Sequence, residues 1–232
     1  MMLNNCYIVI LASGTGQRFG KTEKLPKQFA MLDNKPILCY SIETALSLVK
    51  GSNIILTYPE GMLSQFSSFV DKFKYDIKLV EGGKRRQDSV LKAINSLKDK
   101  NSIVLIHDSA RPLATKSLFE RVYQCAKLNG AAVPVITPTD TVKEISNGII
   151  KKTIDRRLLG LSQTPQGFRL EVLKRVVDVS DFDTEYTDEA MLLETHGVKV
   201  HTVLGERLNL KLTFKEDLDI IKAFAKLLWK TE

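Results

Sequence analysis

The sequence predicts an α/β protein with a Rossmann-like, mostly parallel twisted sheet, helices on both faces and a projecting β-arm. Short apolar runs alternate with longer segments of helical periodicity, a pattern typical of strand–helix alternation. The run Ile103-Val104-Leu105-Ile106 contains no polar residue, as expected of a central strand buried on both faces. Residues 137–163 interrupt the alternation, which predicts an element outside the main sheet.

The expected elements follow from these patterns in chain order. Each strand is assigned to a short apolar run, and each helix to apolar residues that recur every three or four positions. In the last helix, Ile220, Ile221, Phe224, Leu227 and Leu228 form such a face, which we interpret as packing against the core. Strands are expected at 6–12, 53–58, 76–81, 102–107, 131–136 and 198–203, and helices at 36–49, 60–73, 86–98, 115–129, 169–177, 186–195 and 214–229.

The interrupting segment has the pattern of a hairpin. Two β-rich runs, 141–145 and 149–154, flank Asn147-Gly148, a dipeptide that favours a tight two-residue turn. An isolated hairpin is marginal in water and needs a partner surface. We therefore expect one domain over residues 1–232, with a β-arm at about 137–163.

Composition and charge narrow the class of protein. The chain has 44% hydrophobic and 26% charged residues, which is typical of a globular protein. We expect a cytoplasmic protein with no membrane association, because no apolar run reaches the ~18 residues of a membrane helix. The net charge of +7 is scattered rather than gathered with aromatic residues, so we expect no nucleic acid partner. The three cysteines are expected to be small core residues.

The most informative segment follows the first expected strand. Glycines at 14, 16 and 20 would expose backbone N–H groups to an anion, and Arg18 and Lys27 would add two cations. This combination indicates a polyphosphate site, although an ordinary βα turn would also use glycines. The spacing matches neither the dinucleotide fingerprint nor the Walker A loop. A second group follows the strand at 102–107, where Asp108 is placed either to hold a divalent metal or to form a turn.

Nine motifs along nearly the whole chain carry a more specific signal. They occur in the same order as in one family, and the chain resembles the 2-C-methyl-D-erythritol 4-phosphate cytidylyltransferases. The resemblance implies an enzyme that transfers CMP from CTP to methylerythritol phosphate, uses Mg²⁺ or another divalent cation, releases pyrophosphate and forms a homodimer through its arm. The motifs are 12–18, 26–28, 82–90, 107–112, 140–143, 155–156, 163–166, 187–190 and 209–213.

The resemblance also implies a role for each site residue. Catalytic roles are expected for Arg18, Lys27 and Lys211, and acceptor binding for Arg111, Thr141, Arg156 and Thr187, of which Thr141 and Arg156 would act in the partner's site. Nucleotide binding is expected for Ala12, Ser13, Gly14, Thr15, Gly16, Gly83, Ser89 and Asp108, and Asp108 is also the expected metal ligand.

Three alternatives remain at this point. Ribitol-5-phosphate cytidylyltransferases share the nucleotide site and the arm, and we favour the methylerythritol phosphate family from the motifs at 140–143 and 187–190. A nucleotide-binding module without catalysis is disfavoured by the joint presence of Arg18, Lys27 and Asp108. A basic nucleic-acid-binding protein lacks support from the aromatic residues. Two departures from the resembled pattern, Ser13 in place of the frequent alanine and a two-residue insertion between Gly20 and Pro26, leave the acceptor fit open.

Overall fold

The computed structural model describes residues 2–14, 16, 19, 26–181 and 183–228. Its centre is an eight-stranded sheet in which β10 and β11 both pair with β7, and β12 pairs with the other edge of β7. From β7 the order continues through β11, β6, β1 and β4 to β5. The strands are β1 (Cys6–Leu11), β4 (Ile54–Tyr58), β5 (Lys78–Glu81), β6 (Ile103–Asp108), β7 (Ala131–Ile136), β10 (Leu161–Ser162), β11 (Gln166–Arg169) and β12 (His201–Leu204).

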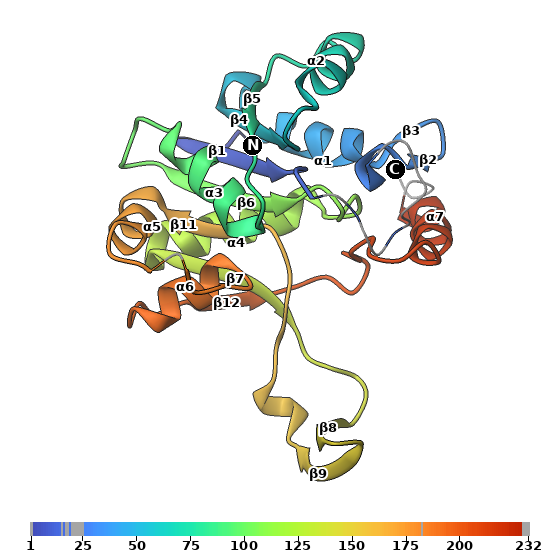
Figure 1. Ribbon diagram of the computed structural model, residues 1–232, viewed down its shortest axis with the longest axis vertical. Coiled ribbons are helices and arrows are strands. Elements are labelled where there is room, and N and C mark those ends of the chain that lie inside the picture. The colour runs from blue at the N-terminus through green and yellow to red at the C-terminus, as the bar shows by residue number, and fades with distance from the viewer. Residues whose placement is uncertain (1, 15, 17–18, 20–25, 182, 229–232) are drawn as a thin grey trace.

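The sheet is mostly parallel, as the sequence predicts. The pairs β1–β4, β1–β6, β4–β5 and β7–β12 are parallel, and only β10 and β11 run against their neighbours. Because β1, β4, β5 and β6 point the same way, their carboxyl ends meet at one edge of the sheet (Figure 1). We call this edge, with the loops that follow these strands, the carboxyl edge.

Helices cover both faces of the sheet, and each side has its own apolar core. On one face, α1, α2 and α4 pack over Ile8, Ile10 and Leu105; on the other, α3, α5 and α6 pack over Val9, Val104 and Ile106. The alternation of neighbouring residues between the two cores explains why the segments 8–10 and 103–106 contain no polar residue. The helices are α1 (Ile37–Leu46), α2 (Leu63–Lys72), α3 (Arg86–Asn95), α4 (Lys116–Asn129), α5 (Leu170–Val177) and α6 (Glu189–Thr195).

A third, smaller core lies beside the carboxyl edge. There α7 (Asp217–Leu228) packs near the ribbon of β2 (Met31–Leu32) and β3 (Lys35–Pro36), around the buried Leu32, Leu212 and Ile221 (Figure 1). This core fixes the two segments that carry Lys27 and Lys211. Short 3₁₀ turns occupy Lys27–Phe29, Gly51–Asn53 and Arg156–Leu158.

The six strands and seven helices expected from the sequence are all present, with shifts of a few residues at their ends. Four further strands, β2, β3, β10 and β11, were not predicted from the sequence. These strands have two to four residues and no apolar run, so neither periodicity nor length distinguishes them from loops.

The hairpin is also present. β8 (Val142–Ser146) and β9 (Ile149–Ile154) form a separate two-stranded sheet that projects from the body (Figure 1). Asn147 and Gly148 have φ angles of 50° and 76°, as a two-residue hairpin turn requires. The expected end of the arm at 163 is too late, because β10 and the backbone N–H of Gln163 pair with β7 in the main sheet.

Within the part of the chain that the structure describes, no helix is both long enough and apolar enough to cross a membrane.

Candidate active site

The loop after β1 is anchored to the ends of the neighbouring segments. The Ala12 N–H donates a hydrogen bond to Thr57 Oγ1 at 3.1 Å, at the end of β4. The Ala12 carbonyl accepts a hydrogen bond from the buried Gln28 amide, next to Lys27. The first residues of the predicted phosphate loop are thus held from both sides. Thr15 and Arg18 lie outside the described residues, so their predicted roles stay predictions.

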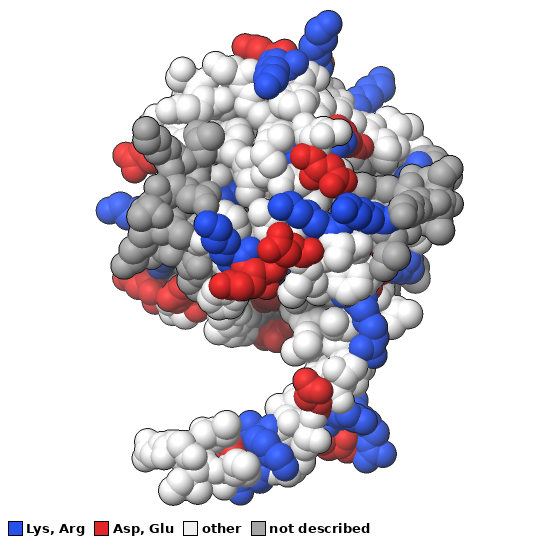
Figure 2. Space-filling model, turned by 90° about the vertical axis from the view of Figure 1, so that its right-hand side faces the viewer, with Lys and Arg blue, Asp and Glu red and all other residues white. Residues whose placement is uncertain are grey.

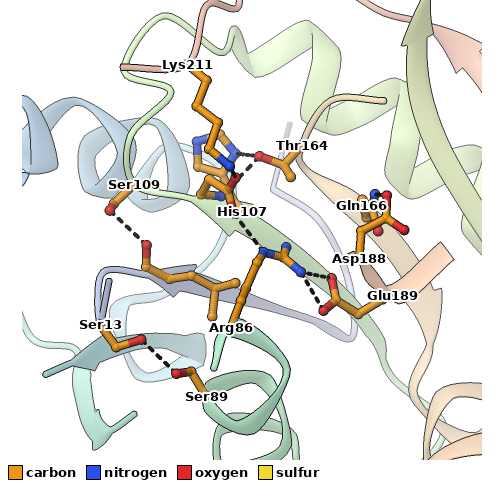
Figure 3. Close-up of polar contacts among 12 residues, drawn as sticks. Ser13, Arg86, Ser89, His107, Ser109, Thr164, Gln166, Asp188, Glu189 and Lys211 are labelled. Atoms are coloured by element: carbon orange, nitrogen blue, oxygen red, sulfur yellow. Dashed lines mark hydrogen bonds and ion pairs between the residues drawn. The ribbon is translucent and has the colours of Figure 1, made fainter. Parts of the chain in front are cut away.

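Hydroxyl groups connect this loop to the segment that precedes α3. Ser13 Oγ donates to Ser89 Oγ at 2.8 Å (Figure 3). Ser89 Oγ also accepts from the Gly83 N–H at 3.0 Å. The close approach requires a glycine at position 82, where a Cβ atom would lie 2.3 Å from the Cβ of Ser13. The structure therefore brings together four residues expected to bind the nucleotide: Ala12, Ser13, Gly83 and Ser89.

Lys27 lies between the glycine loop and the segment before α7. Its Nζ donates to the Leu212 carbonyl at 2.9 Å. Gly16 has a φ angle of 68°, and a Cβ there would lie 3.2 Å from Cγ of Lys27. The lysine stem thus packs against the bare backbone of the loop, which places its charge beside the predicted phosphate site.

Asp108 ends β6 and is the centre of a charged cluster. Lys211 Nζ lies 2.6 Å from one carboxylate oxygen, and Arg86 Nε lies 3.2 Å from the other. Burial alone would raise the pKa of Asp108, but the charges of Arg86, Lys211 and Arg111 outweigh it and hold the pKa far below its usual range. Asp108 is therefore a carboxylate anion at neutral pH.

Arg86 reaches a second carboxylate that the sequence analysis did not single out. Its NH1 group donates to both oxygens of Glu189, at 2.7 and 2.9 Å. Burial would lower the pKa of Arg86, and Glu189 and Asp108 together raise it above its usual value. Both residues belong to recognised motifs, 82–90 and 187–190, but only the fold shows that the motifs touch. In the sequence Arg86 simply follows two other basic residues, Lys84 and Arg85, and nothing there indicates that it pairs with two acids.

The remaining polar residues at the end of β6 support this cluster. Arg111 donates from NH1 to the Asn209 carbonyl at 2.7 Å, on the segment that leads to Lys211. His107 is fully buried and lies 3.1 Å from Thr164 Oγ1 and 3.3 Å from the Arg111 carbonyl. Burial lowers the pKa of His107 to about 4, so the ring is neutral. These surroundings indicate a structural role for His107.

The predicted acceptor residues are divided between two places. Thr187 is exposed next to Asp188, the N-cap of α6, close in sequence to Glu189. Thr141 and Arg156 are exposed at the arm, where Arg156 donates to the Thr139 carbonyl. The arm extends away from the carboxyl edge of its own chain (Figure 1). The structure thus does not bring Thr141 and Arg156 to this chain's carboxyl edge.

The side chains at the carboxyl edge fit a magnesium ion that is delivered with a polyphosphate. Among the described residues, no cluster of three or more His, Cys, Asp or Glu side chains could hold a metal by itself. Mg²⁺ commonly takes only one or two carboxylates and completes its shell with substrate phosphates and water. The ionised Asp108 supplies the kind of oxygen ligand that such a site needs.

A parallel α/β sheet with a glycine loop, two lysines and a carboxylate at its carboxyl edge defines a Rossmann-like nucleotidyltransferase. The model of the IspD family, described as 2-C-methyl-D-erythritol 4-phosphate cytidylyltransferase, matches residues 6–226. The chain therefore belongs to the 2-C-methyl-D-erythritol 4-phosphate cytidylyltransferase family.

Individual relatives are similar in sequence or structure over nearly the whole chain. A 2-C-methyl-D-erythritol 4-phosphate cytidylyltransferase of Aquifex aeolicus is 40% identical over 217 residues, covering 92% of this chain and 94% of the relative. One from Clostridium perfringens is 38% identical over 224 residues, covering 94% and 97%. The crystal structure of the Thermus thermophilus enzyme superposes with a TM-score of 0.77 at 26% identity, covering 95% and 98%.

Proposed function

We propose that this chain transfers CMP from CTP to 2-C-methyl-D-erythritol 4-phosphate at the carboxyl edge and releases pyrophosphate. The observation that carries the proposal is the Asp108 carboxylate, held between Lys211 and Arg86 beside the loop that contains Ala12 and Ser13. Family membership supports the identity of the acceptor, because the family and its relatives are named after 2-C-methyl-D-erythritol 4-phosphate.

The proposed reaction needs residues that position the two substrates and neutralise their charges, and it needs no general base. The attacking group is an oxygen of the acceptor phosphate, which is already anionic at neutral pH. His107 is buried and neutral, and its two ring nitrogens are engaged within the protein, so it is not a base for this step. We infer that catalysis comes from in-line placement of the two phosphates and from charge neutralisation in the transition state.

Lys27 and Lys211 are the described cations suited to that neutralisation. Lys27 is fixed beside the glycine loop, where the α-phosphate of CTP is expected, and Lys211 is fixed beside Asp108. Arg18 is expected to add a bidentate contact to the same phosphate. A divalent cation bound by Asp108 would neutralise the triphosphate and the departing pyrophosphate. Gly83 and Ser89 are expected to contact the base and ribose.

The test is an assay of pyrophosphate release by the full-length protein. We expect release only when CTP, a divalent cation and methylerythritol phosphate are all present. Replacing methylerythritol phosphate with ribitol 5-phosphate should nearly abolish it, and faster release with ribitol 5-phosphate would overturn the assignment of the acceptor. No release with either acceptor, in a folded protein that binds CTP, would contradict the proposed activity itself.

We also propose that the arm completes the site of a second copy of the chain. The arm has no core of its own: Ile145, Ile149 and Ile150 are 58–64% exposed near its tip, and Leu158 is 83% exposed. Figure 2 shows the arm standing clear of the body with basic side chains along it and an uncharged tip. An exposed apolar hairpin of this kind is best buried against the same element of a two-fold mate. Thr141 and Arg156 would then reach the partner's acceptor phosphate.

Mixed dimers test the shared site. Arg156→Ala and Lys27→Ala homodimers should each be nearly inactive, because every site carries one lesion. Heterodimers of the two variants should regain one intact site of two, since both lesions then fall in the other site. Verified heterodimers without activity would show that Arg156 does not act across the interface, and a monomer at assay concentration by light scattering would exclude the shared site.

A further inference from the structure

Arg86 occupies a position that the proposed chemistry leaves unexplained. Its guanidinium group pairs with two carboxylates: Nε lies 3.2 Å from Asp108, and NH1 lies 2.7 Å from Glu189, the pair labelled in Figure 3. The Glu189 carboxylate is 3% exposed and the Asp108 carboxylate 11% exposed. One arginine holds both of these buried acids. The arrangement therefore depends on the planar guanidinium group, which has donors at more than one edge.

The three residues come from three different parts of the fold. Arg86 begins α3, just after the segment that carries Gly83, while Asp108 ends β6 and Glu189 begins α6. The Arg86 side chain therefore connects the segments expected to bind the nucleoside, the metal and the acceptor.

The next residue of α3 reinforces this connection. Gln87 donates from its amide to the Thr184 carbonyl at 2.9 Å and accepts from the Tyr186 N–H at 2.8 Å. Gln87 and Arg86 thus fix the chain on both sides of Thr187, through residue 186 and residue 189. The first turn of α3 sets the position of Thr187 relative to Asp108.

From this geometry we infer that Arg86 is a positioning residue for the transfer reaction. Through its pair with Glu189, Arg86 holds Asp108 at a fixed position relative to the segment around Thr187. The inference rests on the proposed function. Arg86 acts on the reaction through Asp108 and contacts no reacting atom. Lys211 alone, on the other side of Asp108, would draw the carboxylate toward itself once Arg86 is removed.

The first experiment separates turnover from nucleotide binding. Arg86→Gln should lower kcat by about 10²-fold, the scale expected when a reacting group is misplaced by about 1 Å. The affinity for CMP, measured by calorimetry, should change little, because Gly83 and Ser89 keep their mutual hydrogen bond. Arg86→Lys should restore little turnover, since one ammonium group cannot reproduce the two-edged contact. Arg85→Gln is the matched control and should keep wild-type kcat, because the ion pair of Arg85 is with Asp88, three residues further along the same segment.

The second experiment separates positioning from simple stability. Arg86→Gln and Glu189→Gln each leave a buried charge without its partner and should lower the Tm by roughly 10 °C. The double variant Arg86→Gln/Glu189→Gln removes both charges, so most of the Tm should return while kcat stays as low as in Arg86→Gln. A return of kcat together with the Tm would show that the pair only stabilises the fold, and would overturn the inference.

A double-mutant cycle tests the route of action. In an Asp108→Asn background, Arg86→Gln should cost only a few-fold more in kcat, because the group that it positions is already lost. Multiplicative losses would show that Arg86 acts independently of Asp108. Normal turnover of methylerythritol phosphate by Arg86→Gln would contradict the inference alone, whereas a wild-type protein without turnover would contradict the proposed function.

Discussion

Two ion pairs of the same chemical kind show how differently the carboxyl edge and the arm are built. At the carboxyl edge, Arg86 meets Asp108 at 3.2 Å, with side chains that are 26% and 11% exposed. On the arm, Arg157 meets Asp155 at 2.7 Å, with side chains that are 85% and 40% exposed. The arm pair is shorter, yet solvent screens it, so a surface contact of this kind contributes little to stability. Burial rather than distance therefore determines which of the two ion pairs contributes more to stability.

Apolar side chains show the same difference. In the body they fill three cores, and Val9, Ile10 and Ile106 of the central strands are fully buried. On the arm, Ile145, Ile149 and Ile150 are more than half exposed. The apolar side chains of the body are therefore buried within the chain itself, whereas burial of the apolar side chains of the arm requires a partner surface. A residue's role can be judged from one chain at the carboxyl edge, but on the arm only from an assembly.

The largest effect is expected from the acid of the buried pair. Asp108→Asn should lower kcat/KM on the order of 10³-fold, because it removes the proposed metal ligand and leaves Lys211 and Arg86 without their partner. It should also cost about 3 kcal/mol of unfolding free energy, since two cations lose their counter-charge. Asp155→Asn on the arm is the control for stability and should leave the Tm almost unchanged. Equal shifts of the Tm in both variants would remove the distinction between the two pairs.

The next effect concerns two lysines. Lys27→Ala should lower kcat by about 10²-fold while CTP affinity changes less, because the cation acts mainly on charge that develops in the transition state. Lys152, which pairs with Glu144 on the arm with both side chains more than half exposed, supplies the control. Steady-state kinetics and CTP titration would check this. Near-normal turnover by a folded Lys27→Ala protein would show that Lys27 is an ordinary surface residue.

The sequence predicted the fold well because strong apolar runs determine it. Ile103-Val104-Leu105-Ile106 is a central strand, and Asn147-Gly148 is a hairpin turn, as local chemistry requires. β11 was not predicted, because Gln166–Arg169 has no apolar run and is a strand only through its neighbours β6 and β7. Its place between them depends on tertiary pairing, which no local pattern encodes.

The site shows the same limit. Lys27, Asp108 and Lys211 were predicted from motifs, and the structure brings them to one edge of the sheet. The Arg86–Glu189 pair joins residues 103 positions apart, so no spacing along the chain could reveal it. Charge along the chain gives no indication of the pair either, because the residues next to Arg86 in the sequence, Lys84 and Arg85, are basic as well. The ion pairs with Asp108 and Glu189 become visible only in the folded structure, where the three side chains are largely buried together.

A smaller effect is expected from pH, and it also differs between the regions. Burial lowers the pKa of His107 to about 4, below its usual value near 6.5, so the folded protein favours the neutral ring. The stabilisation is complete above pH 6.5 and is lost as the pH falls toward 4, amounting to about 2 kcal/mol between pH 8 and pH 5. The arm contains no histidine and should not contribute.

Urea unfolding of the metal-free protein at several pH values measures this term. The slope of stability against pH should become shallower in His107→Asn than in wild type, whereas His201→Asn, at an exposed position of β12, should leave it unchanged. Identical slopes in His107→Asn and wild type would show that His107 is not held neutral by burial.

The smallest and most local effect compares two glycines. Gly82→Ala would place a Cβ atom 2.3 Å from Ser13, so it should cost about 1–2 kcal/mol and weaken CMP binding by moving the segment that carries Gly83. Gly148→Ala meets no atom within 4 Å, but its φ angle of 76° is unfavourable for alanine by about 1 kcal/mol. Because the arm lacks a core, this strain should open the hairpin locally and leave the unfolding of the body unchanged. We therefore expect Gly148→Ala to weaken dimerisation in sedimentation experiments and to leave CMP affinity intact, whereas weaker CMP binding in this variant would show that the arm and the carboxyl edge are coupled within one chain.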